Sequence, residues 1–163
     1  MKTLVADIGG TNSRLAFAVT SENEKKIELE NIQKFRNSNF KNFDEVIEEY
    51  LSISDDASAN QMCIAAAGII SGSTVEMSNL NWKITAPSLK KIANAKKVLI
   101  INDLQAQGYA LDFLKPKDLE TLIEGNHSVD PHDIKLVCGM GTGFNVAISY
   151  QTPFGTFVPA SEY

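Results

Sequence analysis

The chain has 163 residues, of which 44% are hydrophobic and 21% charged, a composition typical of a globular protein with one sizeable core. The net charge is -5 and the Lys and Arg residues are scattered, so the sequence offers no basic patch for nucleic acid or an anionic membrane. No run approaches the roughly 20 apolar residues of a membrane-spanning helix, and Asp7 interrupts the first apolar run too early for a signal peptide, so we expect a cytoplasmic protein that binds a small molecule.

The first predicted elements are three strands and a helix. Residues 3–8 and 13–20 are short apolar or alternating runs, and residues 9–12 between them have the composition of a tight hairpin turn. A third run, residues 26–35, alternates weakly. Apolar residues then recur at helical spacing over residues 43–51, and Asn42 is a suitable N-cap.

The middle of the chain alternates between strands and helices. Residues 62–67 form a small apolar run, which predicts a central strand covered on both faces. After a polar, hairpin-like segment, Pro87 opens a short helix that we expect to reach Ala95. Residues 98–101 predict a second buried strand, and residues 104–114 predict a helix. Gly108 should be the weak point of that helix.

Two further strands are predicted at residues 134–138 and 144–150, with a glycine-rich turn between them. The resulting order is βββαβαβα, which requires a mixed sheet flanked by helices. We treat residues 1–163 as one domain by default.

The cysteines and histidines give no sign of a metal site. Cys63 and Cys138 each lie in an apolar run, where we expect reduced, buried thiols. His127 and His132 stand in a polar segment without cysteines or carboxylates at ligand spacing. A site built from protein ligands alone is therefore not expected.

Asp7 ends the first predicted strand, and a turn with two glycines follows it. Such a turn can present backbone N–H groups to an anion, and its polar side chains add further donors. An ordinary hairpin turn with an aspartate at its edge remains an alternative. The residues of this turn are Gly9, Gly10, Thr11 and Asn12.

A second glycine-rich turn spans residues 139–143 and can also wrap backbone donors around phosphate oxygens. It is not a dinucleotide-binding fingerprint, because a strand follows it where that fingerprint requires a helix. The Walker lysine of a P-loop is also missing from it.

Polar residues follow two of the middle elements. Asn102 and Asp103 come directly after a predicted buried strand, at the edge where open α/β folds bind ligands, although Asp103 could simply cap the next helix. Asn79 and Asn81 could bind a polyol or merely shape a turn. Trp82, next to them, is more typical of a core than of a sugar platform.

These motifs, taken in order, resemble the bacterial glucokinase family of the actin-like, sugar kinase and Hsp70 ATPase superfamily. The matching segments extend along the whole chain. They are Asp7-Ile-Gly-Gly-Thr-Asn-Ser-Arg14, Ala65-Ala-Ala-Gly68, Ser78-Asn-Leu-Asn-Trp82, Ile101-Asn-Asp-Leu104, Gly139-Met-Gly-Thr-Gly143 and Pro159-Ala-Ser-Glu162.

The resemblance implies an RNase H-like, actin-like ATPase domain and an ATP- and Mg²⁺-dependent kinase that makes glucose 6-phosphate. By the same resemblance, Asp103 is the catalytic base and Asp7 orients Mg²⁺, often through water. Sugar ligands would be Asn79, Asn102, Asp103 and Glu162. ATP phosphates would be held by Gly9, Gly10, Thr11, Asn12, Gly141, Thr142 and Gly143.

The resemblance further implies that residues 1–163 are the N-terminal domain of a two-domain sugar kinase, inactive without its C-terminal domain and a homodimer at full length. Two alternatives stay open. One is a kinase for another hexose or an N-acetylhexosamine, and the other is a sugar-sensing regulator of the same fold without catalysis. The preferred hexose and the phosphoryl donor, whether ATP, ADP or polyphosphate, are not fixed by the sequence.

Overall fold

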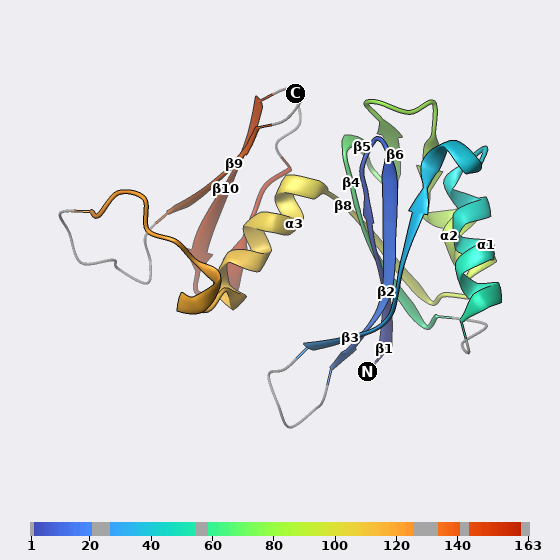
Figure 1. The fold of residues 1–163 in the computed structure, drawn as a ribbon, viewed down its shortest axis with the longest axis horizontal. Helices are drawn as coiled ribbons and strands as arrows, with labels where there is room; N and C mark the ends of the chain where they lie inside the picture. The colour runs from blue at the N-terminus through green and yellow to red at the C-terminus, as the bar shows by residue number, and fades with distance from the viewer. Residues whose placement is uncertain (1, 21–26, 55–58, 126–133, 141–143, 161–163) are drawn as a thin grey trace. The chain divides into compact units, whose positions relative to one another are not determined.

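The computed structural model describes residues 2–20, 27–54, 59–125, 134–140 and 144–160. These residues form two compact units, the first ending at Asp103 and the second running from Leu104 onwards (Figure 1). Each unit contains β-sheet strands of its own.

The first unit is built on a five-stranded mixed sheet. A meander of three antiparallel strands is followed by two strands parallel to the first, and the sheet order is β3-β2-β1-β4-β8. This confirms the predicted meander and mixed sheet. The strands are β1 (Lys2–Ile8), β2 (Asn12–Thr20), β3 (Ile27–Arg36), β4 (Gln61–Ala66) and β8 (Lys97–Asn102).

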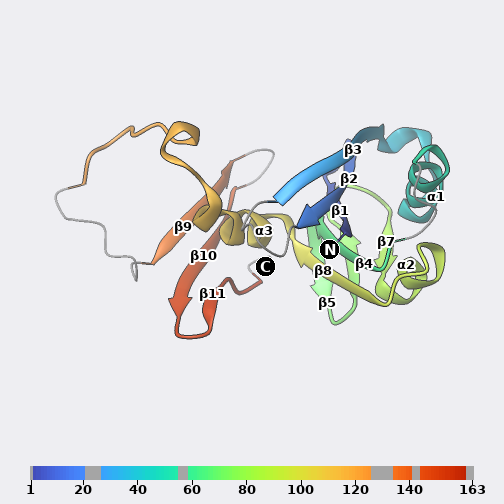
Figure 2. The ribbon, with the colours of Figure 1, turned by 90° about the horizontal axis from the view of Figure 1, so that it is seen from below.

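Two helices, α1 (Phe43–Ile53) and α2 (Ala86–Ile92), cover one face of this sheet (Figures 1 and 2). The side chain of Asn42 accepts a hydrogen bond from the Glu45 N–H and caps α1 as predicted. Helix α2 ends before Ala95, because Asn94 adopts a left-handed φ of 51° just beyond it.

The core of the first unit lies between that sheet and the two helices. Strand β4 buries alternate residues toward the helices, while Cys63 and Ala65 on its other face are only half-buried. In β8, Leu99 is 56% exposed. The prediction that β4 and β8 are buried on both faces is thus wrong for the face of the sheet opposite α1 and α2, since these helices cover one side only.

A second, three-stranded sheet in this unit was predicted only as a polar hairpin. It consists of β5 (Gly68–Ser71), β6 (Thr74–Met77) and β7 (Lys83–Thr85). A Cβ on Gly68 would lie 2.3 Å from the Glu76 carbonyl oxygen, so the close approach of β5 and β6 requires glycine. Trp82 is 7% exposed with its ring 6.4 Å from that of Phe43, which confirms its role in the core.

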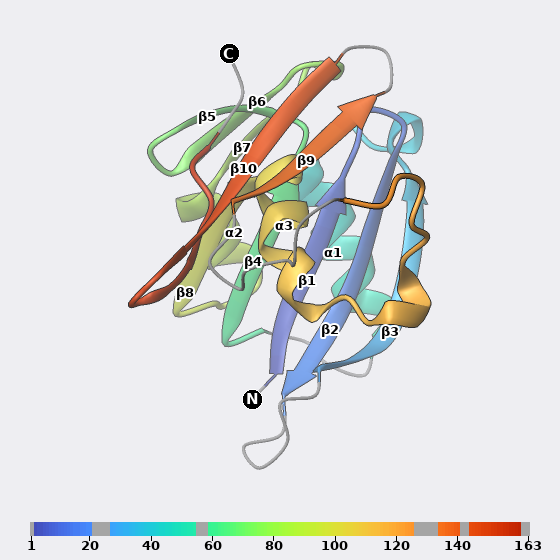
Figure 3. The same cartoon turned by 90° about the vertical axis from the view of Figure 1, so that its left-hand side faces the viewer.

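The second unit pairs a helix with an antiparallel sheet of order β11-β10-β9, and Figure 3 shows β9 and β10 side by side. The elements are α3 (Asp103–Ala110), a 3₁₀ turn (Leu111–Phe113), β9 (Lys135–Met140), β10 (Phe144–Thr152) and β11 (Gly155–Phe157). A further 3₁₀ turn covers Pro116–Asp118. The predicted helix and the first two strands are confirmed, whereas β11 was not foreseen.

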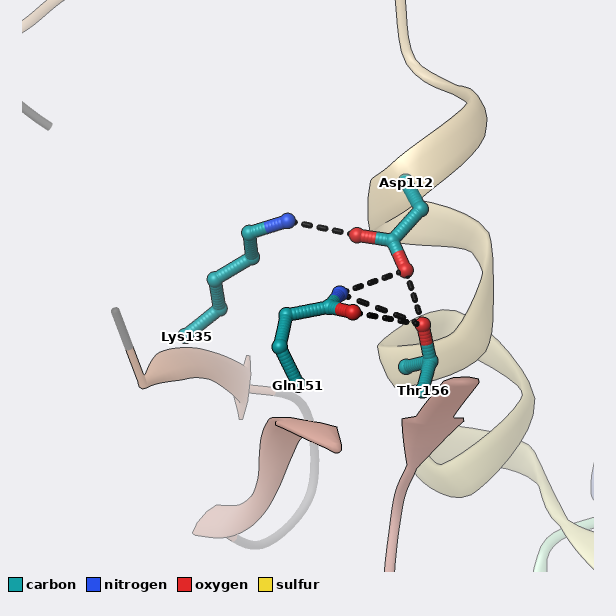
Figure 4. A network of polar contacts seen from close by, with 4 residues as sticks. All are labelled: Asp112, Lys135, Gln151 and Thr156. Carbon is teal, nitrogen blue, oxygen red and sulfur yellow. Dashed lines mark hydrogen bonds and ion pairs between the residues drawn. The ribbon is translucent and has the colours of Figure 1, made fainter. Parts of the chain in front are cut away.

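Asp112 links the helical segment of this unit to its sheet (Figure 4). Its carboxylate accepts hydrogen bonds from Lys135 Nζ at 2.5 Å and Gln151 Nε2 at 2.8 Å, and it also contacts the Thr156 hydroxyl. The hydrogen bond from Lys135 is the largest of the influences that lower the pKa of Asp112 to about 2. An ionised Asp112 therefore belongs to the folded state.

Both cysteines are free thiols, but they differ in burial. Cys63 is half-buried, and burial raises the pKa of its thiol. Cys138 is exposed, contrary to expectation, because the alternation of β9 puts it on the same face as the exposed Leu136 and Met140.

The described residues contain no group of three or more metal-ligating side chains, while His127 and His132 lie outside them. Among the helices of the same described residues, none has the length and apolarity needed to cross a membrane.

Candidate active site

The carboxyl ends of three parallel strands place the candidate residues of the first unit along one edge of its sheet. In the pairing register, Asp7 stands beside Ala65, and Ala65 stands beside Ile101. Asn102 is the last residue of β8, and Asp103 follows it as the first residue of α3. Two strand spacings separate β1 from β8, so their backbones lie about 10 Å apart at this edge.

The turn after β1 keeps two backbone donors available. The Gly9 N–H donates to the carbonyl of Asn12 at 3.0 Å, which closes the turn on itself. Within the described part of the chain, the N–H groups of Gly10 and Thr11 donate to no protein acceptor. Adjacent unpaired N–H groups are what an anion-binding turn needs.

Asn79 lies beside this turn. A Cβ on Gly10 would come within 3.1 Å of the Asn79 Cβ, so the absence of a side chain at residue 10 lets the two segments touch. Asn79 and Asn81 are both exposed. Of these two asparagines, only Asn79 has a contact with the glycine turn among the described residues.

The carboxylate of Asp7 is accessible at the edge of the sheet. Its Oδ2 atom lies 3.3 Å from Arg14 Nη1, and the two side chains are 58% and 61% exposed. Asp7 and Arg14 are directly opposite each other on β1 and β2, which explains the contact. A solvent-facing carboxylate of this kind suits Mg²⁺, which binds oxygen ligands and keeps several waters.

Asn102 and Asp103 differ in accessibility. Asn102 is 1% exposed at the end of β8, while Asp103 is partly exposed and begins α3. The junction of strand and helix therefore presents the Asp103 carboxyl to solvent more than the Asn102 amide. A partly exposed carboxylate can accept a proton from a hydroxyl placed against it.

The remaining predicted ligands, Gly141, Thr142, Gly143 and Glu162, lie outside the described residues. Next to them, Met140 at the end of β9 pairs with Phe144 at the start of β10.

A family model described as Glucokinase matches residues 4–162, almost the whole chain. The chain belongs to the glucokinase family. Among the curated glucokinases, that of Saccharophagus degradans is 33% identical over 144 residues, a match that covers 88% of this chain and 44% of the relative. The glucokinase of Helicobacter pylori is 30% identical over 156 residues, covering 94% of this chain and 44% of the relative. The chain thus spans about 44% of the length of these relatives.

Solved structures agree with the family. The crystal structure of a glucokinase from an Antarctic psychrotroph aligns with a TM-score of 0.85 and 29% identity, covering 99% of this chain and 50% of that one. A ROK family glucokinase from Streptomyces griseus, in complex with glucose and AMPPNP, aligns with a TM-score of 0.57 at 18% identity, covering 91% of this chain and 44% of that one. The second similarity shows that this chain has the mixed α/β fold found in sugar kinases.

The glucokinase-family motifs pointed to the turn and the strand ends, but sequence reasoning missed two buried polar residues of the first unit, Ser13 and Asn37. Asn37 follows the third strand in a polar stretch, Asn37-Ser38-Asn39, that resembles any loop. Only its burial, at 2% exposure, distinguishes it.

Proposed function

We propose that the protein transfers the γ-phosphoryl group of ATP to glucose, giving glucose 6-phosphate and ADP. We further propose that this chain supplies the N-terminal domain of a two-domain enzyme. Its match to about 44% of the length of curated glucokinases supports the second proposal. The first rests on one observation: the accessible Asp7 and Asp103 share a sheet edge with a glycine turn in which two N–H groups have no acceptor among the described residues.

In this proposal the turn of residues 9–12 holds phosphate oxygens of ATP through the N–H groups of Gly10 and Thr11. Residues 141–143 hold further phosphate oxygens. Asp7 holds Mg²⁺ through water, and when bound, Mg²⁺ offsets the charge that develops on the transferred phosphoryl group. Phosphoryl transfer needs positioning and charge stabilisation more than covalent help, so the part of this chain on the donor side is to position the phosphates and Mg²⁺.

Asp103 acts as the general base in this proposal. The 6-hydroxyl oxygen of glucose bonds to the γ-phosphorus as the bond from that phosphorus to the ADP oxygen breaks, and the hydroxyl proton passes to the Asp103 carboxylate. Asn79, Asn102 and Glu162 hold other sugar hydroxyls. The contact between Asn79 and the turn at Gly10 supports a sugar site next to the phosphate site.

The test is an assay of the full-length protein with glucose, mannose and N-acetylglucosamine as acceptors and ATP, ADP and polyphosphate as donors. Glucose with ATP and Mg²⁺ should give the highest kcat/KM. A higher kcat/KM for another sugar would identify that sugar, and not glucose, as the substrate. Binding of glucose without phosphoryl transfer from any donor would favour the non-catalytic regulator instead.

A further inference from the structure

Two buried polar side chains lie beneath the glycine turn of the first unit. Asn37 is 2% exposed and Ser13 is completely buried. The Asn37 amide donates from Nδ2 to the carbonyl of Gly9 at 2.8 Å, and its Oδ1 accepts from the Ser13 hydroxyl at 2.8 Å. The backbone N–H of Asn37 donates to the carbonyl of Thr11 at 3.0 Å. Asn37 thus binds the backbone carbonyls of two of the four residues of the turn, Gly9 and Thr11.

Asn37 is itself held firmly. The preceding residue, Arg36, pairs with Asn12 at the end of β3, so the backbone enters the turn in register. The Asn37 carbonyl accepts from the Phe40 N–H at 3.0 Å in a 3₁₀ turn, and the Phe40 ring packs edge-on against Phe35 at 5.8 Å. Because these contacts hold the backbone at Asn37 in place, Asn37 can hold the glycine turn in a fixed position.

These bonds determine which backbone groups of the turn stay available. The carbonyls of Gly9 and Thr11 are both engaged by Asn37, and that of Asn12 is engaged by the Gly9 N–H. The N–H groups of Gly10 and Thr11 donate to none of the residues that the structure describes, which leaves them available to a ligand. With three of its four carbonyls hydrogen-bonded, the turn is preorganised for a negatively charged group, because donors fixed in advance need no reorganisation on binding.

We propose that Asn37 is a positioning residue for the nucleotide: it fixes the carbonyls of Gly9 and Thr11 so that the adjacent N–H groups face the phosphates of ATP. This rests on the proposed function, in which the turn holds those phosphates. Ser13 orients the side chain of Asn37. The Ser13 hydroxyl donates to Asn37 Oδ1, so the amide NH₂ group of Asn37 is the end that faces Gly9.

Three substitutions separate these contributions. Asn37→Ala removes both side-chain bonds. Asn37→Asp keeps the shape and the acceptor for Ser13, but sets an oxygen against the Gly9 carbonyl and adds a negative charge near the phosphates. Ser13→Ala leaves the bond to Gly9 in place and releases only the orientation of the amide. The expected order of effect is therefore Asn37→Asp, then Asn37→Ala, then Ser13→Ala.

The measurement is the Kd of the full-length protein for AMPPNP with Mg²⁺ and, separately, for glucose, by calorimetry. Both Asn37 variants should weaken nucleotide binding by about tenfold or more, the loss expected when a bond to a positioned backbone group is removed. The Kd for glucose should change by less than about threefold. Asn37→Asp should also lower the affinity for AMPPNP more than that for the less charged AMP.

Ser88→Ala is the matched control. It removes a part-buried hydrogen bond of 2.5 Å from Ser88 Oγ to Asp44 Oδ2, which joins α2 to α1 in the same unit. It should lower the melting temperature but leave the Kd for AMPPNP unchanged. If Ser88→Ala weakens nucleotide binding as much as the Asn37 variants do, or if those variants weaken glucose and AMPPNP binding equally, Asn37 has a structural role only.

The outcomes also separate this inference from the proposed function. A wild-type protein that binds AMPPNP but phosphorylates no glucose contradicts the proposed function, while the binding data still decide the role of Asn37. A wild-type protein that binds no nucleotide overturns both. If Asn37→Ala does not fold, the Asn37→Asp and Ser13→Ala variants carry the test.

Discussion

The side chain of Asn79 lies against the backbone of Gly10, so closely that a Cβ on residue 10 would come within 3.1 Å of the Asn79 Cβ. The contact joins the segment after β6 to the turn after β1. It ties the position proposed for a sugar ligand to the turn proposed for phosphates. A change at either residue should therefore affect both substrates.

Gly10→Ala tests this coupling. The added methyl group must displace Asn79 by a few tenths of an ångström, which the exposed Asn79 can do at little cost to stability. We expect KM to rise severalfold for both ATP and glucose, on the order of 1 kcal/mol of lost binding each, with a nearly unchanged melting temperature. Gly125→Ala is the control, since a Cβ there meets nothing within 4 Å. An unaltered KM for glucose would show that Asn79 takes no part in the sugar site.

Asp7→Asn tests the proposed Mg²⁺ site. The ion pair between Asp7 and Arg14 is well exposed, so its loss should cost no more than about 1 kcal/mol of stability. Turnover should nevertheless fall by at least about 100-fold, with a higher Mg²⁺ concentration needed for half-maximal rate. The control is Glu76→Gln, which breaks an equally exposed pair with Lys83 at 3.0 Å, outside the proposed site. Wild-type Mg²⁺ dependence in Asp7→Asn would exclude Asp7 from metal binding.

Local patterns in the sequence were enough to predict most elements of the fold. Alternation and helical spacing located β1, β2 and α1, because each buries one side against the same core. They did not reveal β5 to β7, whose strands have three or four residues and depend on pairing with one another. Burial on both faces of β8 was also mispredicted, since an apolar run does not show which faces other elements cover.

The candidate site was predictable where it depends on chain position and unpredictable where it depends on long-range contacts. Asp7 lies near the carboxyl end of β1 and Asp103 directly follows β8, so their shared edge could be inferred from the order of elements. The role of Asn37 could not be inferred in this way, because it arises from hydrogen bonds to Gly9 and Ser13 that form only in the folded hairpin. No local pattern marks such a residue.

The carboxylate of Asp112 predicts a pH dependence for the stability of the second unit. Its pKa of about 2 in the folded state is below the ordinary value of 3.8, so its contribution is complete above about pH 4 and is lost as the pH falls toward 2. Asp112→Asn should therefore melt below the wild type at pH 6, with the difference disappearing near pH 2. Lys135→Met should remove most of this pH dependence, since Lys135 is the largest cause of the shift. A difference in melting temperature that is independent of pH would contradict this account.

Gly108→Ala sets helix propensity against packing. In an exposed helix, alanine would stabilise by about 1 kcal/mol relative to glycine. Here the new Cβ would lie 2.8 Å from Val158 Cγ1, and Val158 is completely buried, so overpacking of about 1–3 kcal/mol should prevail and lower the melting temperature. Adding Val158→Ala should restore part of the loss, giving a double variant more stable than the two single effects predict. A higher melting temperature for Gly108→Ala alone would show that Val158 moves aside freely.

Asp103→Asn is the most direct test of the proposed chemistry, because it keeps the shape of the side chain while removing its capacity to accept a proton. If Asp103 is the general base, kcat should fall by roughly 10²- to 10⁴-fold while the Kd for glucose changes much less. If Asp103 only begins α3, the variant should keep both its stability and its turnover, since asparagine caps a helix as well as aspartate does. Asp44→Asn, in the first turn of α1, controls for the loss of a negative charge at a helix start. A variant that melts normally and phosphorylates glucose at a near wild-type rate would remove Asp103 from the mechanism, whereas loss of turnover with an unchanged melting temperature and glucose Kd would place the proton transfer at this carboxylate.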